Sequence, residues 1–161
     1  QGDQPFIDPK MIEEVVAPLL KDPSLNMCTL KHAVKDPKDF ADPSVVKVVT
    51  DKYGDALYFS RSLIPFPREK VRHVVYEHVG IYAYRKSFLC AFSQLDRTLL
   101  EQVESLEQLR ALEHGFSIRV VETKTIDHEF SGFSVDTMED LIRAEELLVE
   151  RGYADNVMVK G

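Results

Sequence analysis

Two aspartates stand at positions where a carboxylate could bind a cation. Asp3 lies in the segment Gln1-Gly2-Asp3-Gln4-Pro5, which is typical of a strand that ends in a loop, and open α/β sheets bind ligands at such strand ends. Asp136 lies far along the chain, three residues before Glu139. Two loop carboxylates that fold together could hold Mg²⁺, because this ion takes one or two protein carboxylates and completes its shell with substrate phosphates and water. Each residue also has a structural interpretation, Asp3 as a turn former and Asp136 as a helix N-cap.

Two further side chains have the chemistry to recognise an anionic or hydroxylated ligand. His78 enters an apolar strand beside Gly80 and Tyr82, where an imidazole could hydrogen-bond to a hydroxyl or a carboxylate. Arg61 ends another apolar strand, and its guanidinium could pair in a bidentate way with a carboxylate. The alternatives are a structural histidine and a structural ion pair.

Glu107 and Gln108 are neighbouring polar residues within a predicted amphipathic helix. On helical periodicity alone they belong to its solvated face.

Composition excludes several classes of function. No two of the 7 glycines are close enough to form a G-x-G-x-x-G or P-loop motif, so the usual glycine cradle for phosphates is missing. The net charge of −7 argues against nucleic acid or an anionic membrane as the main partner. Apolar runs fall short of the roughly 18 residues that span a membrane, and no signal segment is recognisable. We therefore expect a cytoplasmic protein, in which Cys28 and Cys90 are buried, reduced thiols.

These candidate residues need a mixed set of elements to position them. Asp8 and Pro9 predict a helix start, and Gly54 predicts a tight hairpin turn. The predicted helices are 9–20, 86–92, 98–112 and one that begins at 136 and stops at Gly152, and the predicted strands are 26–34, 45–50, 56–60, 79–84 and 116–120, with a loop or short helical turn at 35–43. Mixed helices and strands in a chain of 161 residues indicate one α/β domain.

Several blocks of sequence resemble the 3-deoxy-manno-octulosonate cytidylyltransferase (CMP-Kdo synthetase) family, in the family's order. The blocks are QGDQP at 1–5, VKVV at 46–49, ALYFSRSLIP at 56–65, HVGIYAYR at 78–85, LEQLR at 106–110 and VDTMEDL at 135–141. The resemblance implies a nucleotide-diphospho-sugar transferase-like α/β/α sandwich with a mixed sheet, incomplete in this chain. Residues 1–161 would form a single partial domain, the sugar-acid-binding half, because the family's N-terminal loop that holds the CTP phosphates has no counterpart here.

The resemblance also implies an activity and a site. The activity is Mg²⁺-dependent cytidylyl transfer from CTP to 3-deoxy-D-manno-octulosonate (Kdo), which gives CMP-Kdo and pyrophosphate for lipopolysaccharide biosynthesis. Carried over by motif, Asp3 and Asp136 would be the metal ligands, while the sugar-acid pocket would be lined by Gln1, Arg61, His78, Tyr82, Glu107 and Gln108. We expect a homodimer, and a chain that releases no pyrophosphate by itself. The alternatives are transfer to another acidic sugar, such as 8-amino-Kdo, and a non-catalytic binding or dimerisation module.

Overall fold

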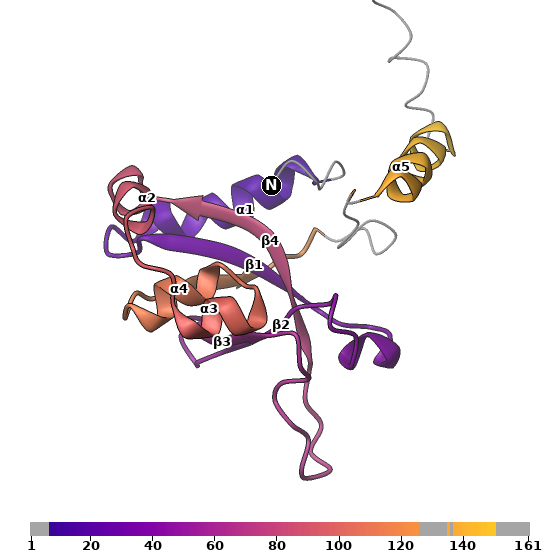
Figure 1. The fold of residues 1–161 in the computed structure, drawn as a ribbon, viewed down its shortest axis with the longest axis horizontal. Coiled ribbons are helices and arrows are strands. Elements are labelled where there is room, and N and C mark those ends of the chain that lie inside the picture. Colours follow the sequence, from indigo (N-terminus) through magenta and orange to yellow (C-terminus); the bar gives the residue numbers. More distant parts are fainter. Residues whose placement is uncertain (1–6, 126–134, 136, 151–161) are drawn as a thin grey trace, which may run out of the picture.

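The computed structural model describes residues 7–125, 135 and 137–150. Within these residues one mixed sheet of five strands has helices on both of its faces (Figure 1). The strands are β1 (Met27–Ala33), β2 (Lys47–Thr50), β3 (Ala56–Ser60), β4 (Tyr76–Tyr84) and β5 (Arg119–Glu122), in the order β3-β2-β4-β1-β5. β1 and β5 are parallel, and the other neighbouring strands are antiparallel. The predicted α/β sandwich with a mixed sheet is confirmed.

Helix α1 (Pro9–Lys21) covers one face of the sheet (Figure 1). It begins as predicted, because Asp8 caps it by accepting a 2.8 Å hydrogen bond from the Lys10 N–H, and Pro9 fits the first turn, which needs no amide donor. Its apolar side chains pack against the β1 and β4 side chains that point to the same face. The buried members of this cluster are Met11, Val15, Leu19, Leu25, Cys28, Leu30 and Val79.

Three short helices cover the other face: α2 (Lys86–Phe92), α3 (Leu99–Glu104) and α4 (Gln108–Glu113). The core here is larger and richer in aromatic side chains. Its buried members are Met27, Val48, Phe59, Phe88, Phe92, Leu106, Leu109, Ala111, Ile118 and Val120. We call this side of the sheet the aromatic face and the other side the α1 face.

The predicted hairpin and turn elements are confirmed. β2 and β3 pair around a turn in which Gly54 has φ +87°, a backbone conformation that favours glycine. The segment predicted as a loop or short helical turn contains a 3₁₀ helix, η1 (Pro37–Phe40). β4 pairs with β1 through a bulge at Thr29 and Leu30, which re-aims the side chains of the central strands.

The single helix predicted at 98–112 is wrong, because the chain forms α3 and α4 with a break at Ser105. Ser105 adopts the left-handed conformation, with φ 54°. In an unbroken helix Glu101 and Arg110 would lie about 13 Å apart along the axis. The break turns α4 back, so that the Arg110 guanidinium meets the buried Glu101 carboxylate at 2.5 and 2.8 Å. It also leaves apolar side chains of α3 in solvent, with Val103 72% exposed.

Smaller differences concern the end of the chain and one thiol. β5 begins at Arg119, not at residue 116. Helix α5 (Met138–Glu150) forms, and the reciprocal hydrogen bonds of a capping box join Thr137 and Asp140. The predicted N-cap, Asp136, lies outside the described residues. The predicted stop at Gly152 lies outside the described residues. Cys28 is buried as predicted, but Cys90 is exposed, because it lies on the outer side of α2 while Phe88 and Phe92 point inward.

None of the helices formed by the described residues combines the length and the apolar composition that crossing a lipid bilayer requires.

Candidate functional site

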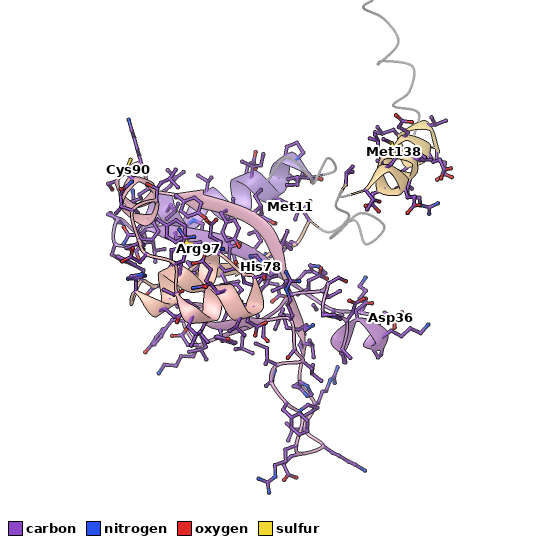
Figure 2. All side chains as sticks on the ribbon, viewed as in Figure 1. Met11, Asp36, His78, Cys90, Arg97 and Met138 are labelled. Carbon is purple, nitrogen blue, oxygen red and sulfur yellow. The ribbon has the colours of Figure 1, made fainter. Side chains whose placement is uncertain are left out.

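Strand β4 presents a row of rings to the aromatic face. The Phe59 ring meets the His78 ring edge-on at 5.0 Å between centroids, and Tyr82 and Tyr84 continue the row at 5.3 and 5.9 Å. Side chains two positions apart on a strand point the same way, which explains why Tyr82 and Tyr84 share a face. His78, labelled in Figure 2, lies on β4 near the middle of the molecule. Two of the predicted pocket residues, His78 and Tyr82, are therefore in contact.

His78 is held in a neutral state. Its Nε2 lies 2.9 Å from the hydroxyl oxygen of Thr29 on β1. Desolvation by the surrounding rings lowers the pKa of His78 to about 3, because a charged imidazolium loses its hydration there. A neutral imidazole is suited to a ligand hydroxyl rather than to charge pairing with a carboxylate.

Tyr82 keeps its phenolic proton. Burial raises the pKa of Tyr82 well above its usual value, and the charges of Tyr84 and Glu107 raise it further. Burial, with a further contribution from the Glu107 charge, raises the pKa of Tyr84 to about 12. Both phenols therefore stay protonated at neutral pH.

Glu107 and Gln108 differ sharply although they are neighbours. Glu107 is 63% exposed, and its carboxylate accepts a hydrogen bond from Arg110 at 3.3 Å, in agreement with a solvated helix face. Gln108 is only 5% exposed, and its buried Nε2 has no hydrogen-bond partner among the residues that the structure describes. A buried amide donor left unpaired costs about 1–3 kcal/mol. The prediction of a solvated face is wrong for Gln108, whose amide nitrogen is a buried donor.

Arg61 forms no ion pair with a described residue, so the structural ion pair considered from sequence is absent there. Its Nε donates to the backbone carbonyl of Glu104 at 2.8 Å, and its Nη1 donates to the carbonyl of Pro43 at 2.9 Å. These neutral acceptors orient the guanidinium, and no carboxylate of a described residue forms an ion pair with it. A guanidinium held in this way could pair with an anion.

Sequence patterns missed two residues that hold Arg61 in place. The ammonium of Lys47, which is completely buried, donates to the carbonyls of Asp42, Val45 and Arg61 at 2.7, 2.6 and 2.5 Å. The Glu104 carboxylate accepts the Arg61 N–H at 2.9 Å. Desolvation lowers the pKa of Lys47. A lysine between two valines of a buried strand was the available signal, since charged residues are rarely buried without partners.

The remaining predicted site residues, Gln1, Asp3 and Asp136, lie outside the described residues. Across residues 7–125, 135 and 137–150, no three histidine, cysteine, aspartate or glutamate side chains gather closely enough to hold a metal ion.

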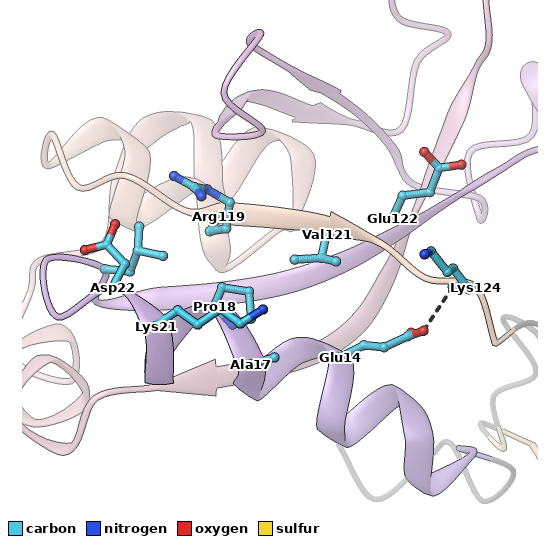
Figure 3. Close-up of a pocket in the computed structure, with 10 residues that line it drawn as sticks. Glu14, Ala17, Pro18, Lys21, Asp22, Arg119, Val121, Glu122 and Lys124 are labelled. Carbon is cyan, nitrogen blue, oxygen red and sulfur yellow. Dashed lines mark hydrogen bonds between the residues drawn. The ribbon is translucent and has the colours of Figure 1, made fainter.

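A groove of about 440 Å³ lies on the α1 face, between α1 and β5 (Figure 3). Its lining includes Glu14, Pro18, Lys21, Arg119, Val121 and Lys124. The Glu14 carboxylate accepts hydrogen bonds from the Thr123 hydroxyl, from the Lys124 N–H at 3.1 Å and from the Thr125 hydroxyl at 3.3 Å. Arg119 is paired with Asp55 at 2.6 Å. Two of the charged side chains of this groove, Glu14 and Arg119, are therefore already paired within the protein.

Comparison with known proteins adds a family and close relatives. A family model described as "Cytidylyltransferase" matches residues 1–126. Proteins named 3-deoxy-manno-octulosonate cytidylyltransferase from Pelobacter propionicus and Solibacter usitatus are 50% and 51% identical, over 157 and 148 residues, and each match covers 91% of this chain. These matches cover 60% and 57% of the relatives, so the chain spans about three fifths of their length.

A solved structure is also similar. It is described as CMP:2-keto-3-deoxy-manno-octonic acid synthetase complexed with CTP, and it is 42% identical with a TM-score of 0.84. The match covers 94% of this chain and 60% of that one.

Proposed function

Because the chain belongs to the cytidylyltransferase family, we propose that it carries the sugar-acid-binding part of an enzyme that transfers a cytidylyl group from CTP to Kdo. The names of the relatives support CTP and Kdo as the substrates. The products of this transfer are CMP-Kdo and pyrophosphate. We propose that CMP-Kdo is made in the cytoplasm and serves lipopolysaccharide biosynthesis.

One observation carries the proposal: the aromatic face combines an uncompensated cation with unused neutral hydrogen-bonding groups. Arg61 supplies the positive charge, Gln108 a buried donor without a partner, and His78 and Tyr82 neutral polar rings. A sugar acid offers the matching groups, one carboxylate and several hydroxyls. We assign its carboxylate to Arg61 and its hydroxyls to His78, Tyr82, Glu107 and Gln108, with Gln1 as a further contact.

Such a pocket would act by orientation. Transfer requires a sugar hydroxyl to attack the α-phosphorus of CTP in line with the departing pyrophosphate, and fixing both reactants favours that geometry. We propose Asp3 and Asp136 as ligands of a magnesium ion, which would offset negative charge on the phosphates. The residues described here would bind and orient the sugar acid.

We further propose that residues 1–161 act as one partial domain, and that CTP binding needs additional residues like those that make the relatives longer. The chain by itself would then release no pyrophosphate from CTP, Kdo and Mg²⁺. A homodimer also belongs to the proposal. The exposed apolar side chains Leu99 and Val103 on α3 support it, and light scattering should give twice the chain mass.

Binding of Kdo to this chain tests the assignment. In isothermal titration calorimetry we expect Kdo to bind, and Arg61→Ala to weaken it about 100-fold, because a charge-assisted bidentate contact is worth about 1.5–3 kcal/mol. Arg61→Lys keeps the charge but loses the planar fork, and it should bind at an intermediate level.

Arg143→Ala is the matched control, since Arg143 is an exposed arginine of α5 that pairs with Glu146. Its Kdo affinity should be unchanged. Unaltered Kdo binding by Arg61→Ala would refute the assignment of Arg61 to the sugar-acid carboxylate. Tighter binding of 8-amino-Kdo than of Kdo would favour the alternative acidic sugar as the substrate.

A further inference from the structure

Thr29 and His78 meet at the bulge between the two central strands. Thr29 is completely buried on β1, where the register shifts relative to β4. Its hydroxyl oxygen lies 2.8 Å from the carbonyl oxygen of Ile81 and 3.2 Å from that of Val79. The third neighbour is Nε2 of His78, at 2.9 Å. One hydroxyl therefore contacts three polar atoms.

The position of the hydroxyl proton follows from what each atom can do. A threonine hydroxyl has one proton to donate, and carbonyl oxygens can only accept. If the proton pointed to His78, no proton would lie between the Thr29 oxygen and the carbonyl oxygens of Ile81 and Val79. These oxygens would then repel one another at hydrogen-bond distance. The proton therefore points to the carbonyls, nearest to Ile81. Toward His78 the hydroxyl oxygen is then an acceptor, and Nε2 must carry a proton.

We infer that Thr29 is a positioning residue that fixes His78 as the Nε2–H tautomer and so presents Nδ1 as a hydrogen-bond acceptor for a hydroxyl of the ligand. A neutral imidazole has one N–H, so a proton on Nε2 leaves a lone pair on Nδ1. Nδ1 makes no hydrogen bond to any residue that the structure describes.

This tautomer determines which part of a ligand His78 can accept. A carboxylate has no proton to donate, so it would meet the Nδ1 lone pair with repulsion, whereas a hydroxyl donates to it. The two residues thus differ in what they would bind, with Arg61 selecting a carboxylate and His78 selecting a hydroxyl. The assignment to a sugar hydroxyl rests on the proposed function, while the tautomer itself does not.

The tautomer can be measured on the ¹⁵N-labelled chain without ligand, by long-range ¹H–¹⁵N correlation spectra of the imidazoles near neutral pH. We expect Nε2 of His78 to show the shift of a protonated nitrogen and Nδ1 that of an unprotonated one. Thr29→Ser keeps the hydroxyl and should keep this pattern. Thr29→Val has almost the same shape without the hydroxyl, and its two ring nitrogens should move toward averaged shifts.

A proton on Nδ1 of His78 in the unmodified chain, or an unchanged pattern in a folded Thr29→Val variant, would overturn the inference. If Thr29→Val does not fold, the spectra of the unmodified chain and of Thr29→Ser decide. Measurements with added Kdo separate the inference about the His78 tautomer from the proposed function. Added Kdo should shift Nδ1, and Thr29→Val should bind Kdo about tenfold more weakly, the effect of one hydrogen bond. The Nε2–H tautomer without any Kdo binding would refute the proposed function alone.

Discussion

The two faces of the sheet differ in whether their polar side chains have hydrogen-bond or ion-pair partners within the protein. On the α1 face, Glu14 at the end of the groove accepts three hydrogen bonds and Arg119 is paired with Asp55. On the aromatic face, the Gln108 amide nitrogen has no partner among the described residues, and the Arg61 guanidinium bonds within them only to neutral carbonyls. Unmet hydrogen-bonding capacity therefore distinguishes the candidate site from a groove of ample volume. Natural proteins retain such costs mainly where a ligand offsets them.

The largest effect on stability is expected at the ion pair that folds α4 back over α3. Glu101→Gln should lower the free energy of unfolding by about 3 kcal/mol, because it leaves the Arg110 charge without its buried partner. Urea unfolding near neutral pH measures this loss. A change below 1 kcal/mol would show that the ion pair does not hold the helices together.

The same pair should produce an acid transition. Hydrogen bonds from Arg110 lower the pKa of Glu101 to about 2 from 4.5, so the folded state favours the ionised carboxyl. The stabilisation is complete above about pH 4.5 and is lost as the pH falls toward 2. Between these pH values, the free energy of unfolding should fall more steeply with decreasing pH for the unmodified chain than for Glu101→Gln. Equal slopes for the two proteins would contradict the assignment of the transition to Glu101.

A substitution at Gln108 should affect stability and Kdo binding in different ways. Gln108→Leu removes a buried donor without a partner, so the free energy of unfolding should stay the same or rise by about 1 kcal/mol. Kdo affinity should fall about tenfold through the lost hydrogen bond. Thermal unfolding and calorimetry on one preparation give both values. A clear loss of stability would mean that the amide already has a structural role.

Glu14→Gln provides the opposite pattern on the α1 face. Its carboxylate orders the chain after β5, so the substitution should cost about 1 kcal/mol of stability and leave Kdo affinity unchanged. Urea unfolding and the same calorimetric titration test this. Weaker Kdo binding by Glu14→Gln would break the distinction between the two faces.

The smallest expected effect concerns the thiols. A thiol reagent should label exposed Cys90 at once and leave Cys28 unreacted, because burial raises the pKa of the Cys28 thiol to about 11. Mass spectrometry of the folded chain should find one label, at Cys90, with no change in the unfolding temperature. Labelling of Cys28 at a similar rate would show that the α1 face opens readily.

Local signals in the sequence were sufficient for most elements and insufficient for the arrangement of the site. Asp8 with Pro9 and Gly54 act on neighbouring residues, and the helix and the turn that they predict are present. The break at Ser105 depends on the pairing of Glu101 with Arg110, and leucine spacing cannot reveal that pairing. The helical pattern also placed Gln108 in solvent, because it did not contain the turn that buries it.

The histidine shows the same limit. Its sequence neighbours indicated a strand residue with either a structural or a ligand-binding role. Its neutrality depends on rings from β3 and β4, and its tautomer depends on Thr29, 49 residues away. Family resemblance assigned His78, Tyr82 and Gln108 to the pocket, and only the fold showed that the two rings are neutral and that the Gln108 amide nitrogen is buried.

Amide chemical-shift mapping of the ¹⁵N-labelled chain during a Kdo titration tests the central claim most directly, because it locates the ligand on one face of the sheet. We predict that the largest shifts fall at Arg61, His78, Tyr82 and Gln108. Shifts concentrated instead along the α1–β5 groove, at Glu14 and Lys124, or no shifts at saturating Kdo, would contradict it.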